Sequence, residues 1–83
     1  MPEVEIGTVS DFFVRPVVAG ITLTGALQKG DKIRIIGHTT NLEFIVESMQ
    51  LNNINVPEGK PGDGIGIKVP DRVRPGDKVY KIT

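Results

Sequence analysis

The chain has 83 residues, with ten Lys and Arg against ten Asp and Glu, no cysteine and one histidine. Its formal net charge is therefore zero, and long-range attraction to nucleic acid through net charge is not expected. The lack of cysteine excludes disulfides, thiolate metal sites and cysteine nucleophiles. The length fits one small domain over residues 1–83, too small for a deep catalytic cleft with a lid.

Membrane insertion and export are not expected from the sequence. No apolar run approaches the ~20 residues that a spanning helix requires. The start of the chain, Met-Pro-Glu-Val-Glu, lacks the basic and apolar parts of a signal peptide. We therefore expect a cytoplasmic protein without membrane contact.

The apolar residues alternate with period two, which predicts β-strands rather than helices. Residues 4–9 predict a first strand with a bulge at Gly7, where the alternation slips by one. In the next strand one face is expected to be buried. In two later strands, Ile33 and Ile35 share one face, and so do Ile65 and Ile67. Residues 42–51 are ambiguous in register, and residues 79–82 predict a last strand. The buried face of the second strand consists of Val17, Ala19, Ile21 and Leu23.

These six or seven short strands, with turn residues between them, predict an all-β fold. We expect a small closed antiparallel barrel, because closure removes exposed sheet edges. The interior of so small a barrel is filled by side chains, which disfavours a small-ligand site inside it.

A Gly-Asp motif occurs three times in the chain, at residues 29–33, 61–65 and 75–79. Glycine takes left-handed turn geometry, and the following aspartate can accept a hydrogen bond from nearby backbone. We interpret the three repeats as turns that lead into strands.

Nucleotide, metal and catalytic sites lack essential parts. In the glycine-rich segment 59–64, Pro61 follows Lys60 where a phosphate-binding loop needs Ser or Thr, so we expect no nucleotide. His38 has no second His or Cys to share a metal, and nothing nominates a nucleophile beside it. We expect no metal, no cofactor and no enzymatic activity.

Three segments are candidates for contact with a partner. Two prolines stiffen the loop 70–75. Its two arginines are suited to bidentate contacts with phosphates. Asp71 and Asp77 are close enough in sequence to neutralise the charge of these arginines. The polar segment 37–41 around His38 is a second candidate. Three adjacent apolar residues, 12–14, cannot all face one side of a strand, so Phe12 or Phe13 is expected to be exposed for partner docking. The candidate nucleic-acid residues are Lys68, Arg72, Arg74, Lys78 and His38.

Five blocks of residues stand in an order that resembles the β-barrel second domain of translational GTPases such as elongation factor Tu. The chain resembles more closely the stand-alone translation elongation factor-like proteins of archaea, through the strings 37–40, 46–50 and 66–69. A similar barrel is appended to collagenase-like peptidases and to related enzymes that help modify tRNA. The five blocks are residues 6–9, 29–35, 46–49, 61–67 and 75–80.

The resemblance implies a non-catalytic, translation-related module that contacts RNA or a ribonucleoprotein through phosphates. It does not supply a binding site, and fold alone does not define function. The alternative is a protein–protein accessory barrel that docks on an enzyme or GTPase subunit, through Phe12 or Phe13 or through an open sheet edge.

Overall fold

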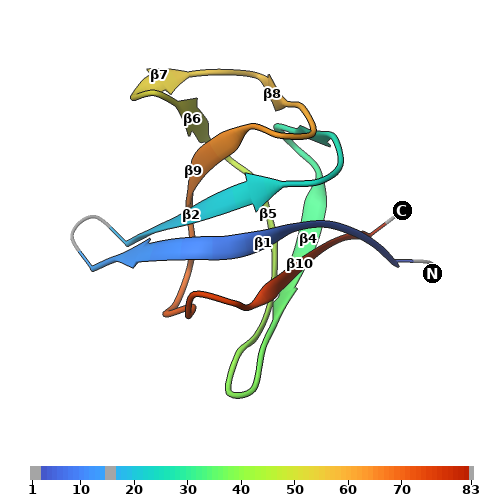
Figure 1. Cartoon of the computed structure of the whole chain (residues 1–83), viewed down its shortest axis with the longest axis vertical. Helices are drawn as coiled ribbons and strands as arrows, with labels where there is room; N and C mark the ends of the chain where they lie inside the picture. Colours follow the sequence, from blue (N-terminus) through green and yellow to red (C-terminus); the bar gives the residue numbers. More distant parts are fainter. Residues whose placement is uncertain (1–2, 15–16, 83) are drawn as a thin grey trace.

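The computed structural model describes residues 3–14 and 17–82, and this part of the chain consists of strands, turns and loops without a helix (Figure 1). No helix in it is therefore long and apolar enough to span a membrane. The strands are β1 (Glu3–Phe13), β2 (Val18–Leu23), β3 (Leu27–Gln28), β4 (Lys32–Ile36), β5 (Asn41–Ile45), β6 (Met49–Leu51), β7 (Ile54–Asn55), β8 (Glu58–Gly59), β9 (Gly64–Lys68) and β10 (Lys78–Ile82).

The alternation in the sequence explains which side chains form the core. Ile21 in β2, Ile33 and Ile35 in β4, and Ile65 and Ile67 in β9 are all buried, while their neighbours in sequence face outward or are partly exposed. Because successive side chains of a strand point to opposite faces, one apolar face per strand is sufficient to build the core. The predicted buried faces are confirmed in all three strands.

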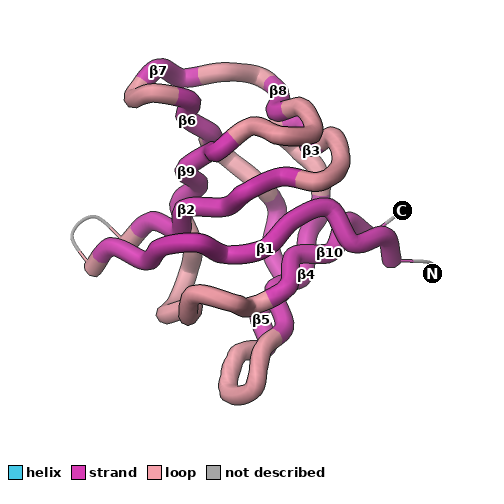
Figure 2. The backbone as a smooth tube through the Cα atoms, viewed as in Figure 1, coloured by secondary structure: helices cyan, strands magenta, loops and turns pink. Residues whose placement is uncertain are grey.

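The strands pair antiparallel in an eight-stranded sheet with the order β5-β4-β10-β1-β2-β9-β6-β7, and β3 pairs with β8 in a separate ribbon. Figure 2 shows these strands wrapping around a common interior. The predicted all-β fold is confirmed. The closed barrel is not, because β5 and β7 are the two ends of the ladder and do not pair with each other.

The ambiguous segment 42–51 is resolved by a change of pairing partner. β5 pairs with β4 up to Ile45, and Val46 forms two backbone hydrogen bonds with Gly30 and Asp31. β6 then pairs with β9 from Met49. Val46 and Met49 are both buried although they are three residues apart, because the strand is interrupted between them. This interruption divides one predicted strand into two, and three two-residue strands that were not predicted, β3, β7 and β8, bring the number in the described residues to ten.

β1 carries the predicted irregularity near Gly7. Its register with β10 shifts between Glu5 and Gly7, and its register with β2 shifts between Val9 and Asp11. A Cβ at Gly7 would lie 2.8 Å from the backbone oxygen of Thr22, so this close approach of two strands requires glycine.

The three Gly-Asp repeats adopt one turn geometry. Gly30, Gly62 and Gly76 have φ of 96°, 94° and 97°, the left-handed region that favours glycine. In each turn the aspartate after the glycine accepts a hydrogen bond from the backbone N–H three residues earlier, at 2.8 Å in the first turn, 3.0 Å in the second and 2.9 Å in the third. Of the three aspartates, Asp77 alone is fully buried, at 6% exposure.

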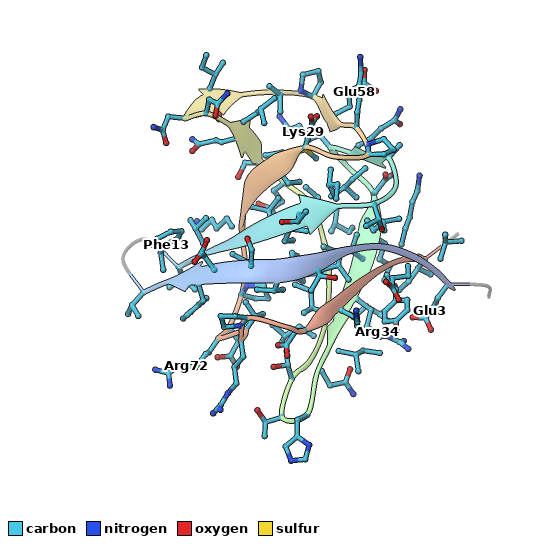
Figure 3. The ribbon with its side chains drawn as sticks, viewed as in Figure 1. Glu3, Phe13, Lys29, Arg34, Glu58 and Arg72 are labelled. Atoms are coloured by element: carbon cyan, nitrogen blue, oxygen red, sulfur yellow. The ribbon has the colours of Figure 1, made fainter. Side chains whose placement is uncertain are left out.

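An ion-pair network joins three strands on the outer surface. Arg34 of β4 contacts Glu43 of β5 at 2.7 Å and Glu3 of β1 at 3.1 Å, and Lys32 contacts Glu43 at 3.1 Å (Figure 3). The hydrogen bond from Arg34, followed by that from Lys32, holds the pKa of Glu43 below its ordinary value. The hydrogen bond to Glu43, followed by the charge of Glu3, raises the pKa of Arg34.

This network predicts a pH-dependent contribution to stability. Because the folded-state pKa of Glu43 lies below its unfolded value, the contribution is full above the unfolded pKa of about 4.3. It is lost as the pH falls through the folded-state pKa. We expect Glu43→Gln to unfold at a slightly lower temperature than wild type at pH 7, and the difference to vanish by about pH 3. Thermal unfolding across this range measures the effect, with Glu58→Gln as the control; equal midpoints of wild type and Glu43→Gln at pH 7 would contradict it.

Candidate functional site

The loop between β9 and β10 presents two arginines on a fixed backbone. Val69 and Val73 are 4% and 1% exposed and anchor the loop in the core, whereas Arg72 and Arg74 are exposed on either side of Val73. The N–H of Val69 also donates to the oxygen of Val17 at 3.2 Å. The alternation of buried valine and exposed arginine therefore directs both cationic side chains outward.

The two aspartates nearest these arginines in the sequence, Asp71 and Asp77, form hydrogen bonds with backbone N–H groups rather than with guanidinium groups. The Asp71 carboxylate accepts a hydrogen bond from the N–H of Arg72 at 2.7 Å, and the Asp77 carboxylate accepts one from the N–H of Arg74 at 2.9 Å. Within residues 3–14 and 17–82, neither arginine side chain forms an ion pair. The two guanidinium groups therefore keep their donors available, although Asp71 and Asp77 stand beside them in the sequence.

The folded chain brings two other candidate segments to the same arginines. One hollow is formed by Arg72 and Arg74 with Asp11, Phe12 and Val14 of the first strand and its continuation. A second hollow is formed by the same arginines with residues 39–42, from the connection between β4 and β5 and the start of β5. We call the combined region the arginine surface and define it by Phe12, Val14, Thr39, Asn41, Arg72 and Arg74.

The remaining predicted basic residues lie outside this surface. Lys68 lines a different hollow, together with Phe44 and Ile45. Lys78 is exposed in β10, where it pairs with Ile36 of β4. His38 is exposed in the connection between β4 and β5. The residues that follow it, 39–42, line the second hollow, but His38 does not. The structure therefore assembles two of the five predicted nucleic-acid residues at one place.

The adjacent phenylalanines separate to different faces, as strand alternation requires. Phe12 is partly buried against the core and its edge reaches the arginine surface, while Phe13 is 54% exposed on the outer face of the sheet. Val14 is 61% exposed beside Phe12. The prediction that one of Phe12 and Phe13 is exposed is confirmed for Phe13.

The arginine surface combines exposed apolar area with two guanidinium groups that form no ion pair with any described residue. Aromatic residues and Arg are enriched at protein interfaces, whereas Lys is depleted. Arg also forms bidentate bonds with carboxylates, through a fork of N–H donors that Lys lacks. Asp11 and Asp71 line the same hollows, so the surface carries charges of both signs. Arg72 and Arg74 can bind carboxylates of a partner at the edge of an apolar contact. In the part of the chain that the structure describes, no three His, Asp or Glu side chains are grouped as metal ligands.

Comparison with known proteins links the chain to peptidases. No family model matches the sequence. The chain is 44% identical over 79 residues to an uncharacterized protease of Methanocaldococcus jannaschii; the match covers 94% of this chain and 19% of the protease. The chain therefore spans about a fifth of the length of this relative.

Solved structures show the same fold. The C-terminal domain of a candidate U32 peptidase of Geobacillus thermoleovorans superposes with a TM-score of 0.89 at 16% identity, covering 95% of this chain and 92% of that domain. Its selenomethionine variant superposes with a TM-score of 0.88, covering 93% of this chain and 98% of that domain.

These findings correct the resemblance to translation factors. The similar sequence is that of a protease and the similar structures are peptidase C-terminal domains, so the assignment to the translation-factor second domain is wrong. The RNA-binding role was based on that assignment and loses its support with it. The Gly-Asp blocks led to the wrong family because they specify turns, and small β folds of different families share such turns.

Proposed function

We propose that this chain is a non-catalytic accessory β-domain that docks on the body of a peptidase-like protein. One observation carries the proposal: 79 residues of the chain align, at 44% identity, with 19% of a protease. A match of that extent supports a domain attached to, or bound by, a larger enzyme whose other parts perform the chemistry.

The arginine surface is the docking site in this proposal. Arg72 and Arg74 would engage carboxylates of the peptidase body, while Val14 and the edge of Phe12 would bury apolar area against it. The partner is accordingly a protein rather than RNA. The cytoplasmic location and the closed barrel stay predictions.

Calorimetric titration tests the proposal directly. The titrant is this chain, and the receiver is the Methanocaldococcus jannaschii protease from which the aligned segment has been deleted. We expect saturable binding with a Kd in the micromolar range, about −8 kcal/mol, because the deletion leaves the docking face of the protease uncovered. The undeleted protease is the control and should not bind, since its own segment occupies that face. No saturable heat with the deleted protease would overturn the proposal.

A further inference from the structure

A shallow groove lies on the outer face of the sheet and shares no lining residue with the arginine surface. Its floor is formed by Gly64 and Gly66 of β9. Phe13 and Val18 line it as well, and the hairpin of β6 and β7 contributes three side-chain amides, those of Gln50, Asn52 and Asn53. The groove has a volume of about 410 Å³, within the range of ligand pockets.

The two floor glycines are not required by the backbone of this chain. Three glycines in the described residues have positive φ, Gly30, Gly62 and Gly76, and neither floor glycine is among them. Glycine in the interior of a strand lowers its stability by roughly 0.5–1 kcal/mol relative to alanine. Backbone conformation therefore gives no reason for glycine at either position.

Packing within the chain does not require these glycines either. Among the residues that the structure describes, a Cβ at Gly64 would meet no heavy atom within 4 Å, and one at Gly66 would meet only Val18, at 3.4 Å, the short end of ordinary contact. The partner of Gly66 across the sheet is Gly20, which the side chains of Ser10 and Asp11 flank, so the bare backbone of the groove is confined to β9. A glycine inside a strand often marks a bulge, a tight bend, or a place where a ligand or another backbone approaches closely. β9 pairs with β2 and with β6 without a register shift, which disfavours a bulge and leaves close approach as a reason for these glycines.

The lining defines the chemistry of the ligand. Among the described residues, none of the side chains that line the groove is charged. Asn52 and Asn53 each offer an amide with both a donor and an acceptor. Gln50 donates one N–H to the Oδ1 of Asn55 at 3.3 Å and keeps its carbonyl oxygen and its second N–H. A peptide unit has the same pair of groups, one N–H and one C=O. Phe13, at 54% exposure, adds an apolar contact at one side.

We infer that this groove binds an uncharged, extended polypeptide segment. The segment lies with its backbone on Gly64 and Gly66, exchanges hydrogen bonds with the amides of the hairpin, and places an apolar side chain against Phe13. This inference goes beyond the docking proposal, because it concerns a different surface and a flexible ligand rather than a folded protein body.

Amide NMR shifts of the isolated chain test the inference, with a capped hexapeptide of glycine and threonine that has one central phenylalanine as the probe. We expect shifts at residues 13, 50–53 and 64–66 that saturate at millimolar peptide. The double variant Gly64→Val/Gly66→Val fills the floor and should weaken binding at least tenfold. Its thermal unfolding midpoint should equal or exceed that of wild type, because valine suits a strand better than glycine.

Gln28→Val, an exposed strand position elsewhere, is the control and should bind as wild type does. Absence of peptide shifts, or unchanged binding by the filled variant, would overturn the inference. A neutral oligosaccharide that produces the shifts while the peptide does not would also overturn it. Because the test requires no peptidase, its outcome is independent of whether the docking proposal holds.

Discussion

Replacing Gly37 with alanine is expected to destabilise the fold by about 1–3 kcal/mol, the usual cost of forcing an extra group into a packed site. A Cβ at this position would overlap the carboxylate of Asp77, which is 6% exposed. The carboxylate would then have to leave its hydrogen bond with the N–H of Arg74. For a chain of this size each kcal/mol lowers the midpoint of thermal unfolding by about 4–8 °C.

A double-mutant cycle with Asp77→Ala identifies the cause. Asp77→Ala alone should cost about 1–3 kcal/mol, because it leaves a partly buried N–H without its acceptor. In that background Gly37→Ala should cost much less, since the overlapping atoms are gone, giving a coupling energy of about 1 kcal/mol or more. Additive effects of the two substitutions in denaturant unfolding would contradict this account of the turn.

Reversing the charge of both exposed arginines, Arg72→Glu/Arg74→Glu, is expected to weaken docking on the segment-deleted protease at least about tenfold, or 1.4 kcal/mol. Carboxylates of the partner that attract the arginines would repel the glutamates, and like charges across an interface cost several kcal/mol. Stability should change by less than about 0.5 kcal/mol, because both side chains are exposed.

The matched control is Lys29→Glu/Lys60→Glu, which makes the same change of net charge. Lys29 and Lys60 adjoin the β3–β8 ribbon, and Figure 3 shows Lys29 at the end of the molecule opposite Arg72. The control pair should dock as wild type does. Equal weakening by both pairs would mean that the affinity depends on total charge, and that the arginine surface is not the docking site.

Local pattern was sufficient to predict much of the fold. The alternation around Ile21, Ile33 and Ile65 identified the buried faces, and the repeated Gly-Asp pairs identified the turns, because both follow from geometry within a few residues. The break after Ile45 was not predictable in detail, since it depends on which distant strand each segment pairs with.

The candidate site was predicted as separate parts rather than as one surface. Arg72, Arg74 and Phe12 were all identified, whereas Val14 was not, and the proximity of these residues depends on pairings between β1, β4, β5 and β10 that a linear pattern does not contain. One feature of the sequence that could have predicted the groove was not used. Gly64 and Gly66 alternate with isoleucines at outward-facing positions where a Cβ would come no closer than 3.4 Å to any atom of the described residues.

Amide hydrogen exchange of this chain, alone and bound to the segment-deleted protease, tests the docking proposal most directly. Buried interfaces slow exchange where they cover the backbone. The account predicts new protection at residues 11–14, 39–42 and 71–75, with residues 28–30 and 58–60 unchanged. Protection confined to the β3–β8 end, or absent everywhere, would contradict docking through the arginine surface.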